Sequence, residues 1–228
     1  MTAAIEKATF QFLKELSTHN NRDWFNANKP RYTAAHENMI AFADHLLLEM
    51  NKHDNIETHS GKESLMRIYR DTRFSKDKTP YKTYFSGSFK RATKKLRGGY
   101  YFEIGPGQTL AAGGFFSPNP QDLHKIRKDI DYNYKDWKKI LANKGLVKTF
   151  GVMQGETVAT APKGFSKDNP AIELLRHKQF YFQRTFTDAE VLDKSFLKEL
   201  NHTFKTLRPY FDYMSEMLTT DGNGISIV

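Results

Sequence analysis

The first fifty residues place apolar side chains at the spacing of an α-helix. Apolar positions recur three and four residues apart over residues 8–17 and again over residues 30–53, which brings them onto one helical face. Asn21 follows a polar turn between these stretches, where an asparagine side chain can cap a short helix. Pro30 stands at the start of the longer stretch, a position that tolerates proline because first-turn amides have no helical partner. We therefore expect three helices.

The period then changes to two, which is typical of strands that have one buried face. Strands are expected at residues 64–69, 83–91, 99–105 and 109–116. A Gly-Pro-Gly turn at residues 105–107 separates the last two stretches, so the last three stretches predict an antiparallel meander. Gly113 and Gly114 mark either a β-bulge, which we favour, or a place where another backbone or a ligand comes close.

The second half of the chain is mainly helical. Asn119-Pro120 begins a periodic stretch that Gly145 would end, and the capping-box sequence Thr187-Asp-Ala-Glu190 begins another. We expect helices at residues 120–143, 170–176 and 187–218 (broken near Pro209), a strand at 178–186, a short strand at 157–160 within an irregular stretch at 146–168, and a loose tail at 221–228. Helices around a largely antiparallel sheet predict the α+β class, and with no linker we expect one domain over residues 1–228.

Composition restricts the protein class. The chain has no cysteine, which excludes disulfides and thiolate chemistry. Residues 1–7 lack the pattern of a signal peptide, and no stretch approaches the roughly 18 apolar residues of a membrane span. We therefore expect a cytoplasmic protein without a membrane partner. The eight histidines show no metal-ligand spacing, so we expect no metal, and no motif points to a cofactor.

Positive charge is concentrated in one stretch. Residues 67–97 contain eleven basic and two acidic residues, and this excess of nine equals the formal net charge of the whole chain, +9. Within it, Arg67, Arg70 and Arg73 lie among apolar residues, where a desolvated guanidinium needs an anionic partner. Residues 90–97 have instead the composition of a solvated hairpin tip, whose lysines discourage edge pairing.

The usual catalytic motifs are missing, because the sequence contains no phosphate-binding loop, dinucleotide fingerprint, nucleophile elbow or zinc-binding His-Glu-x-x-His. The remaining chemistry is a cluster in which guanidinium and ammonium groups can bind phosphate or carboxylate. The candidate ligand-binding residues are Arg67, Arg70, Arg73 and Lys78. The candidate catalytic residues are Asp71, Lys78 and Tyr81. A structural salt-bridge network explains the same cluster equally well, and the sequence leaves both interpretations open.

The run Arg67-x-x-Arg70-Asp71-x-Arg73-Phe74-x-x-Asp77-Lys78-x-x-Tyr81 resembles the signature of the domain of unknown function family 2461, found in bacteria and fungi. Asn20-Asn21-Arg22-x-Trp24-Phe25 with Asn28 and Tyr32 resembles its N-terminal segment, and Gly113-Gly114, Arg127 and residues 180–182 resemble later ones. The resemblance covers residues 8–218. It implies no activity, substrate or catalytic residue.

Three functions stay open. The leading interpretation is a protein that binds an anionic small molecule at the arginine cluster. The second is a metal-independent enzyme acting on a phosphorylated or acidic substrate, with Asp71 as general base and Tyr81 or Lys78 as acid. The third is a scaffold or nucleic-acid-binding protein that uses the basic surface of residues 67–97. A nucleic acid would also recruit Lys76, Lys82, Lys90, Arg91, Lys94, Lys95 and Arg97, with Tyr84 or Tyr101 stacking on a base. The oligomeric state is not predicted.

Overall fold

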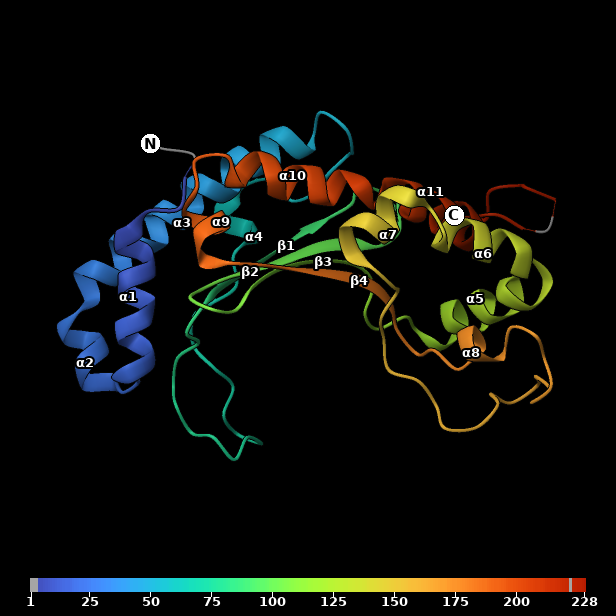
Figure 1. Ribbon diagram of the computed structural model, residues 1–228, viewed down its shortest axis with the longest axis horizontal. Helices are drawn as coiled ribbons and strands as arrows, with labels where there is room; N and C mark the ends of the chain where they lie inside the picture. Colours follow the sequence, from blue (N-terminus) through green and yellow to red (C-terminus); the bar gives the residue numbers. More distant parts are fainter. Residues whose placement is uncertain (1–3, 222) are drawn as a thin grey trace. The chain divides into compact units, whose positions relative to one another are not determined.

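A computed structural model describes residues 4–221 and 223–228. The helices are α1 (Lys7–Thr18), α2 (Arg22–Ala27), α3 (Lys29–Met50), α4 (Gly61–Ser64), α5 (Pro120–Tyr132), α6 (Tyr134–Leu141), α7 (Lys144–Phe150), α8 (Ile172–Leu175), α9 (Asp188–Leu192), α10 (Phe196–Thr206) and α11 (Arg208–Thr219). The strands are β1 (Phe85–Lys90), β2 (Gly99–Ile104), β3 (Thr109–Phe115) and β4 (Phe180–Phe186). They form one antiparallel sheet in the order β1-β2-β3-β4 (Figure 1). This confirms the α+β class and the predicted meander.

The residues of the chain group into two compact units. Unit 1 consists of the described part of Met1–Lys90 with Tyr101–Ala111 and Thr185–Thr203. Unit 2 consists of Arg91–Tyr100, Ala112–Arg184 and the described part of Phe204–Val228. The single domain expected from the sequence therefore stays a prediction.

The core of unit 1 lies where the α3 helix meets its neighbours. Helix α3 packs against α1, α2 and α4, and α4 packs against β1. Phe42 of α3 stacks on Phe196 of α10 with ring centroids 5.7 Å apart, and Phe89 of β1 packs 5.8 Å from Phe102 of β2. These four rings are almost fully buried, so burial of the predicted apolar stripes holds the unit together.

Aromatic residues also form the core of unit 2. Trp137 of α6 is completely buried and lies 6.2 Å from the ring of Phe180 in β4 and 5.6 Å from that of Tyr213 in α11. The buried Tyr210 hydroxyl donates to the Phe180 carbonyl at 3.1 Å, so its polar end is paired, as a buried hydroxyl requires.

Gly113 and Gly114 lie at close approaches within unit 2. A Cβ on Gly113 would come within 2.4 Å of Leu207 Cδ1, and one on Gly114 within 2.4 Å of the Phe180 carbonyl oxygen. Gly114 also has a φ of +147°, a conformation that side-chain-bearing residues rarely adopt. Gly114 therefore permits the close approach of another backbone, the alternative less favoured from the sequence, whereas Gly113 makes room for the Leu207 side chain.

The local helix signals are confirmed. The Asn21 side chain accepts from the Trp24 amide at 2.9 Å, and Asn119 caps α5 through the Asp122 amide at 2.8 Å. The capping box at the start of α9 is complete. Each cap satisfies an amide that has no partner inside its own helix.

Several predicted boundaries are wrong. Residues 64–69 make only isolated antiparallel bridges, Leu65 to Gly87 and Tyr69 to Tyr81, rather than a strand, and Thr157 bridges only to His177. The predicted 120–143 helix ends at Tyr132 and resumes as α6, and Gly145 does not stop a helix because it lies inside α7. The reason is Asn143, whose side chain accepts from the Gly145 and Leu146 amides and starts α7.

The helical C-terminal region also differs from the prediction. The break at Pro209 is confirmed at Leu207, but a further break separates α9 from α10, where Asp193 accepts from the Ser195 amide. The tail is not loose in its described part, because the Ile227 amide donates to the Thr219 carbonyl at 2.9 Å. Position 222 lies outside the described residues.

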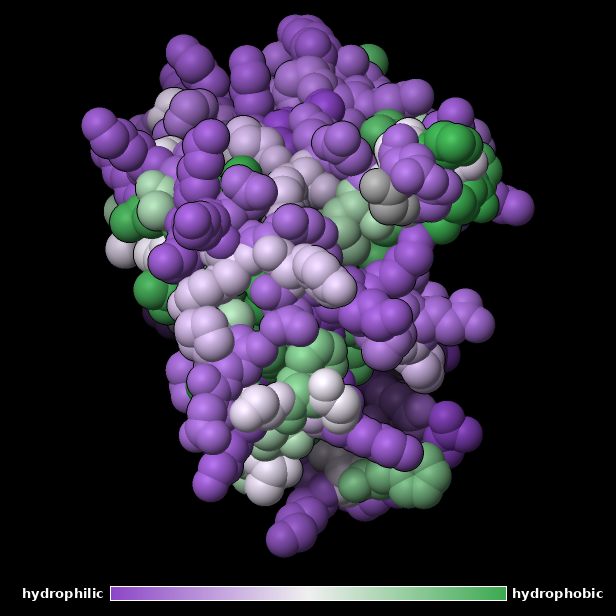
Figure 2. Space-filling model, turned by 90° about the vertical axis from the view of Figure 1, so that its right-hand side faces the viewer, coloured by the Kyte–Doolittle hydropathy of each residue, from purple (hydrophilic) through white to green (hydrophobic). Residues whose placement is uncertain are grey.

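The face of the molecule in Figure 2 is mainly hydrophilic, with hydrophobic side chains in small separate groups. Among the large apolar side chains described, Phe74 and Tyr132 are the most exposed, at 96% and 88%. Within the described part of the chain, no helix has the length and apolar character needed to cross a membrane.

Candidate functional site

The candidate site is built on a long excursion of unit 1 that leaves the sheet before β1 (Figure 1). We call residues 67–82 the basic loop. Its two ends are paired, because the Lys82 amide donates to the Ile68 carbonyl at 2.8 Å and Tyr69 bridges Tyr81. Asn20 extends this pairing: its amide nitrogen donates to the Tyr81 carbonyl at 2.9 Å and its amide oxygen accepts from the Tyr81 amide at 3.1 Å. The loop is thus closed at its base by a residue far away in the chain.

Aromatic rings reinforce the same base. Tyr81, only 4% exposed, stacks on Phe25 with centroids 4.0 Å apart and planes at 12°. Tyr69 and Tyr32 pack around this pair, and the Lys29 amine lies 5.3 Å above the Phe25 ring. Burial raises the pKa of the Tyr81 hydroxyl, which is therefore protonated at neutral pH. The polar-aromatic run around residues 20–32 thus supports the basic loop.

The two acidic residues of the basic loop are each paired with an arginine. Asp77 lies 2.5 Å from Arg70 Nη1, which also donates to the carbonyl and hydroxyl oxygens of Thr79. Asp71 binds Arg73 at two points, Nε at 3.0 Å and Nη2 at 2.7 Å. The Thr79 amide and then Arg70 lower the pKa of Asp77 to about 2, and Arg73 lowers that of Asp71. Both acids are exposed, so the pairs lie at the surface.

The other cations of the loop have no acidic partner within ion-pairing distance among the described residues. Lys78 donates to the Thr72 carbonyl at 2.8 Å, whereas the exposed Arg67 makes no hydrogen bond to any described residue. Lys82 is half-buried and donates weakly to the Ser86 hydroxyl at 3.3 Å. Burial lowers the pKa of the Lys82 amine, the carboxylate of Glu103 opposes this effect, and the charge of Arg67 adds to it. Cations that repel each other in this way favour a bound anion.

A cavity of about 430 Å³ lies against these groups. It is lined by Asn20, Arg70, Asp71, Asp77, Thr79, Tyr81, Lys82, Thr83 and Tyr84, all in unit 1. Its volume is within the roughly 300–1,000 Å³ of small-molecule sites. Of the Arg70 nitrogens, only Nη1 donates a hydrogen bond within the protein. Nε and Nη2 of Arg70 and the Tyr84 hydroxyl have no hydrogen-bond partner among the described residues. These are unused donors in one cavity.

A chain of hydrogen bonds leads from the cavity along the polar face of β1 and β2. Lys82 contacts Ser86, Ser86 hydrogen-bonds Tyr101, and the Tyr101 hydroxyl donates to Glu103 Oε1 at 2.5 Å. Burial, and then Glu103, raises the pKa of Tyr101. The period-two pattern already placed these side chains opposite the buried faces of the strands, but nothing local indicated their connection to Lys82.

The structure therefore separates the predicted site residues. Arg70, Asp71 and Tyr81 line the cavity, whereas Arg67, Arg73 and Lys78 do not. Lys82 and Tyr84 do line it, and sequence reasoning had considered them only for nucleic acid.

The expectation of a solvated tip at residues 90–97 is wrong for its two arginines. The Arg91 side chain is fully buried in unit 2, where it donates to the Arg97 carbonyl, the Ser215 hydroxyl and Asp212, and lies 5.1 Å from the centre of the Phe211 ring. Arg97 pairs with Asp122, and in unit 1 Lys90 pairs with Glu57 at 2.7 Å. Lys94 and Lys95 are exposed, as predicted.

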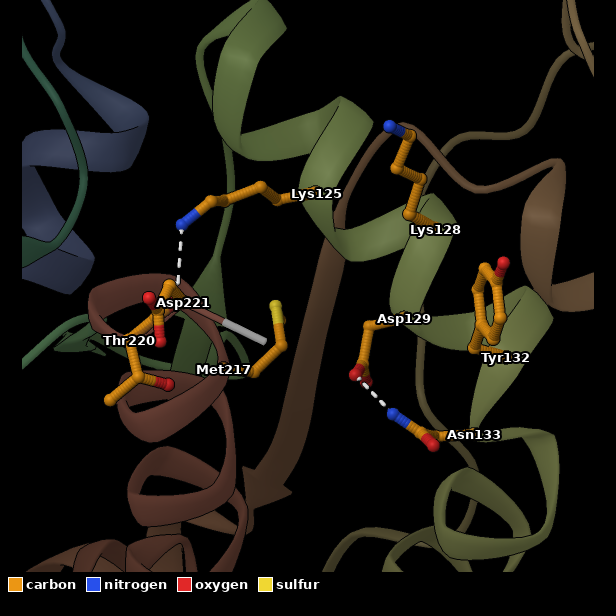
Figure 3. A pocket seen from close by; sticks show the side chains of 8 residues that line it. All are labelled: Lys125, Lys128, Asp129, Tyr132, Asn133, Met217, Thr220 and Asp221. Carbon is orange, nitrogen blue, oxygen red and sulfur yellow. Dashed lines mark hydrogen bonds between the residues drawn. The ribbon is translucent and has the colours of Figure 1, made fainter. Parts of the chain in front are cut away.

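A second cavity of about 430 Å³ lies between α5 and α11 in unit 2 (Figure 3). Of its two carboxylates, Asp129 accepts from Trp137 Nε1, the Tyr213 hydroxyl and the Asn133 side-chain amide at 2.7–2.8 Å. Lys125 points to the end of α11 and donates to the Leu218 and Thr220 carbonyls at 3.3 and 3.5 Å. Most polar groups of this second cavity thus already have hydrogen-bond partners within the protein, so the cavity of unit 1 is the better candidate for a ligand site.

Metal ligation has no support in the described residues, where no three His, Cys, Asp or Glu side chains are grouped to hold an ion.

One family model matches most of the chain. A family model described as conserved hypothetical protein (DUF2461) matches residues 8–213. The chain belongs to this family. Searches of curated proteins and of solved structures found no match. The matched stretch includes both the basic loop and the residues at its base.

Proposed function

We propose that this DUF2461 protein binds an anionic ligand carrying phosphate or carboxylate in the cavity beside the basic loop. The observation that carries the proposal is the unused hydrogen-bonding capacity of Arg70, Lys82 and Tyr84 in the lining of that one cavity. A guanidinium, an ammonium and a phenol are donors suited to a phosphate or carboxylate.

The surrounding charge supports this choice of ligand. Asp77 and Asp71 pair with Arg70 and Arg73, whereas Lys82 has no ion-pair partner among the described residues and its pKa is lowered by burial and by the charge of Arg67, against the opposing effect of Glu103. An anion beside Lys82 would offset that repulsion and favour the charged form of the amine. Arg67, Arg73 and Lys78 would contribute the field around the cavity mouth rather than direct contacts.

Thermal unfolding with and without ligand tests the proposal. Inorganic phosphate or pyrophosphate should replace chloride at constant ionic strength, because a ligand that binds only the folded state stabilises it by about 2.7 kcal/mol at a hundredfold excess over its dissociation constant. Lys82→Gln should abolish the rise in melting temperature, whereas Lys135→Gln, a control at an exposed lysine of α6, should retain it. No rise in the wild type would contradict anion binding.

A metal-independent enzyme is the second candidate, favoured by the hydrogen-bonded chain that leads from Lys82 to Glu103. In this case Glu103 and Tyr101 would serve as the acid–base pair in place of Asp71, whose carboxylate is occupied by Arg73. Turnover of a phosphate ester by the wild type, lost in Glu103→Gln while phosphate still raises the melting temperature, is the expected sign of catalysis.

A further inference from the structure

Phe74 stands exposed in the basic loop. Its side chain is 96% exposed, and between Arg70 and Pro80 it is the only large apolar residue. The ring lies beside the guanidinium of Arg73, which is 5.9 Å from the ring centre, and it takes no part in the core. A single exposed apolar residue is ordinary by itself. The charged residues around this ring suggest what it could bind.

Those surroundings are cationic. The basic loop contains six basic and two acidic residues, and the two acids pair with Arg70 and Arg73. Four basic residues have no acidic partner within ion-pairing distance among the described residues: Arg67, Lys76, Lys78 and Lys82. They flank Phe74 on both sides in the chain, so the ring is exposed within a positive field of several charges.

A ligand that matches an exposed ring among cations carries repeated anions next to flat rings, as a single-stranded nucleic acid does with its phosphates and bases. Lysine and arginine neutralise its phosphates, and an aromatic side chain stacks on any base whose face is open. A duplex hides those faces. An anionic bilayer would also attract the positive charge, but binding to it depends on the apolar area that enters the membrane. Phe74 is the only large apolar residue between residues 70 and 80, so this area is small. The observations therefore favour a nucleic-acid strand over a membrane.

We propose that the basic loop binds single-stranded nucleic acid, with Phe74 stacking on a base and Arg67, Lys76 and Lys78 contacting nearby phosphates. This rests on the proposed function, because the cavity with Arg70 and Lys82 would hold a phosphate of the same strand. It deepens that function by naming the ligand as a polymer, in which base stacking adds to charge.

Two probes of equal charge separate stacking from electrostatics. Fluorescence anisotropy should measure binding of a labelled single-stranded oligonucleotide and of an abasic strand of the same length at several salt concentrations. Phe74→Ala should weaken binding of the base-bearing strand by about tenfold or more and leave binding of the abasic strand unchanged. The control Tyr132→Ala, at a similarly exposed aromatic residue of α5, should change neither.

Neutralising the lysines should give the complementary result. The double variant Lys76→Gln/Lys78→Gln should weaken binding of both strands alike and reduce the salt dependence of log K by about 0.7 for each phosphate that is no longer neutralised. Phe74→Trp provides a direct signal, because stacking on a base should quench its fluorescence with the oligonucleotide and not with the abasic strand.

Several results would overturn the inference: no binding of either strand, an equal effect of Phe74→Ala on both strands, or binding to phosphatidylserine vesicles that needs Phe74 while the oligonucleotide does not bind. The proposed function fails separately. Inorganic phosphate should still raise the melting temperature of Phe74→Ala, and this rise should be absent in Lys82→Gln. If oligonucleotide binding depends on Phe74 but inorganic phosphate does not raise the melting temperature, the inference stands and the cavity is rejected as an anion site.

Discussion

Asn20 and Tyr81 pair through two hydrogen bonds, in which the side-chain amide of one residue satisfies both backbone groups of the other, at 2.9 and 3.1 Å. The arrangement imitates a rung of a β-ladder, although the partners are 61 residues apart. Because Tyr81 also bridges Tyr69, this pairing holds together the two ends of the loop that carries the candidate site.

Asn20→Ala should release the base of the basic loop. Leaving partly buried backbone groups of Tyr81 without partners should cost about 1–3 kcal/mol of unfolding free energy, and trypsin should cut the loop faster at its lysines and arginines. Chemical denaturation and limited proteolysis measure the two effects. Asn26→Ala, at an exposed position of α2, is the control. Equal stability and equal cleavage in both variants would show that the Asn20 side chain does not close the loop.

Arg70→Ala should abolish the phosphate-dependent rise in melting temperature and cost the empty protein little. The Asp77 side chain that loses its partner is 59% exposed, so water can solvate it, and exposed ion pairs contribute little to stability. Paired melting curves at constant ionic strength measure both quantities. A large loss of stability together with no phosphate effect in the wild type would favour a structural salt-bridge network instead.

Asp77 should titrate near pH 2, because the Thr79 amide and Arg70 lower its pKa from 3.8 to about 2. A lowered carboxyl pKa stabilises the folded loop above the ordinary value, and this contribution is lost as the pH falls from about 4 through 2. NMR of the Asp77 carboxyl carbon measures the midpoint. In Arg70→Gln the midpoint should rise but stay below 3.8, since the Thr79 amide still donates; an unchanged midpoint would argue against the ion pair.

Arg91 and the neighbouring lysines should differ in their effect on stability. Arg91→Ala removes a fully buried side chain, takes the side-chain donor from the Arg97 carbonyl and leaves the Ser215 hydroxyl with only the Arg97 amide as donor, which should cost about 3 kcal/mol or more. Lys94→Gln/Lys95→Gln should change stability by no more than about 0.5 kcal/mol, as ordinary surface substitutions do. Urea denaturation of the two variants is the test, and similar losses in both would contradict this assignment.

The local signals in the sequence determined the fold class, the meander and the helix caps. Each depends on residues that are close in the chain, such as Asn21 with Trp24 or Thr187 with Glu190, because periodicity and capping are short-range effects. The sequence also located the excess charge in residues 67–97. The predicted boundaries were wrong at Asn143, where a helix cap was taken for a helix end, and at residues 64–69, which make only isolated bridges.

Only the tertiary structure decided what each charge does. Arg91 and Lys94 stand three residues apart in a run of similar composition, yet the first is buried against Asp212, 121 residues away, and the second is exposed. Likewise, Arg70 and Lys82 share a cavity, whereas Arg73 turns to Asp71. A guanidinium remains available to a ligand only through the N–H groups to which folding brings no carbonyl or carboxylate, as Nε and Nη2 of Arg70 show. For a residue such as Arg91, packing brings the decisive partner from a distance in the chain that no sequence pattern records.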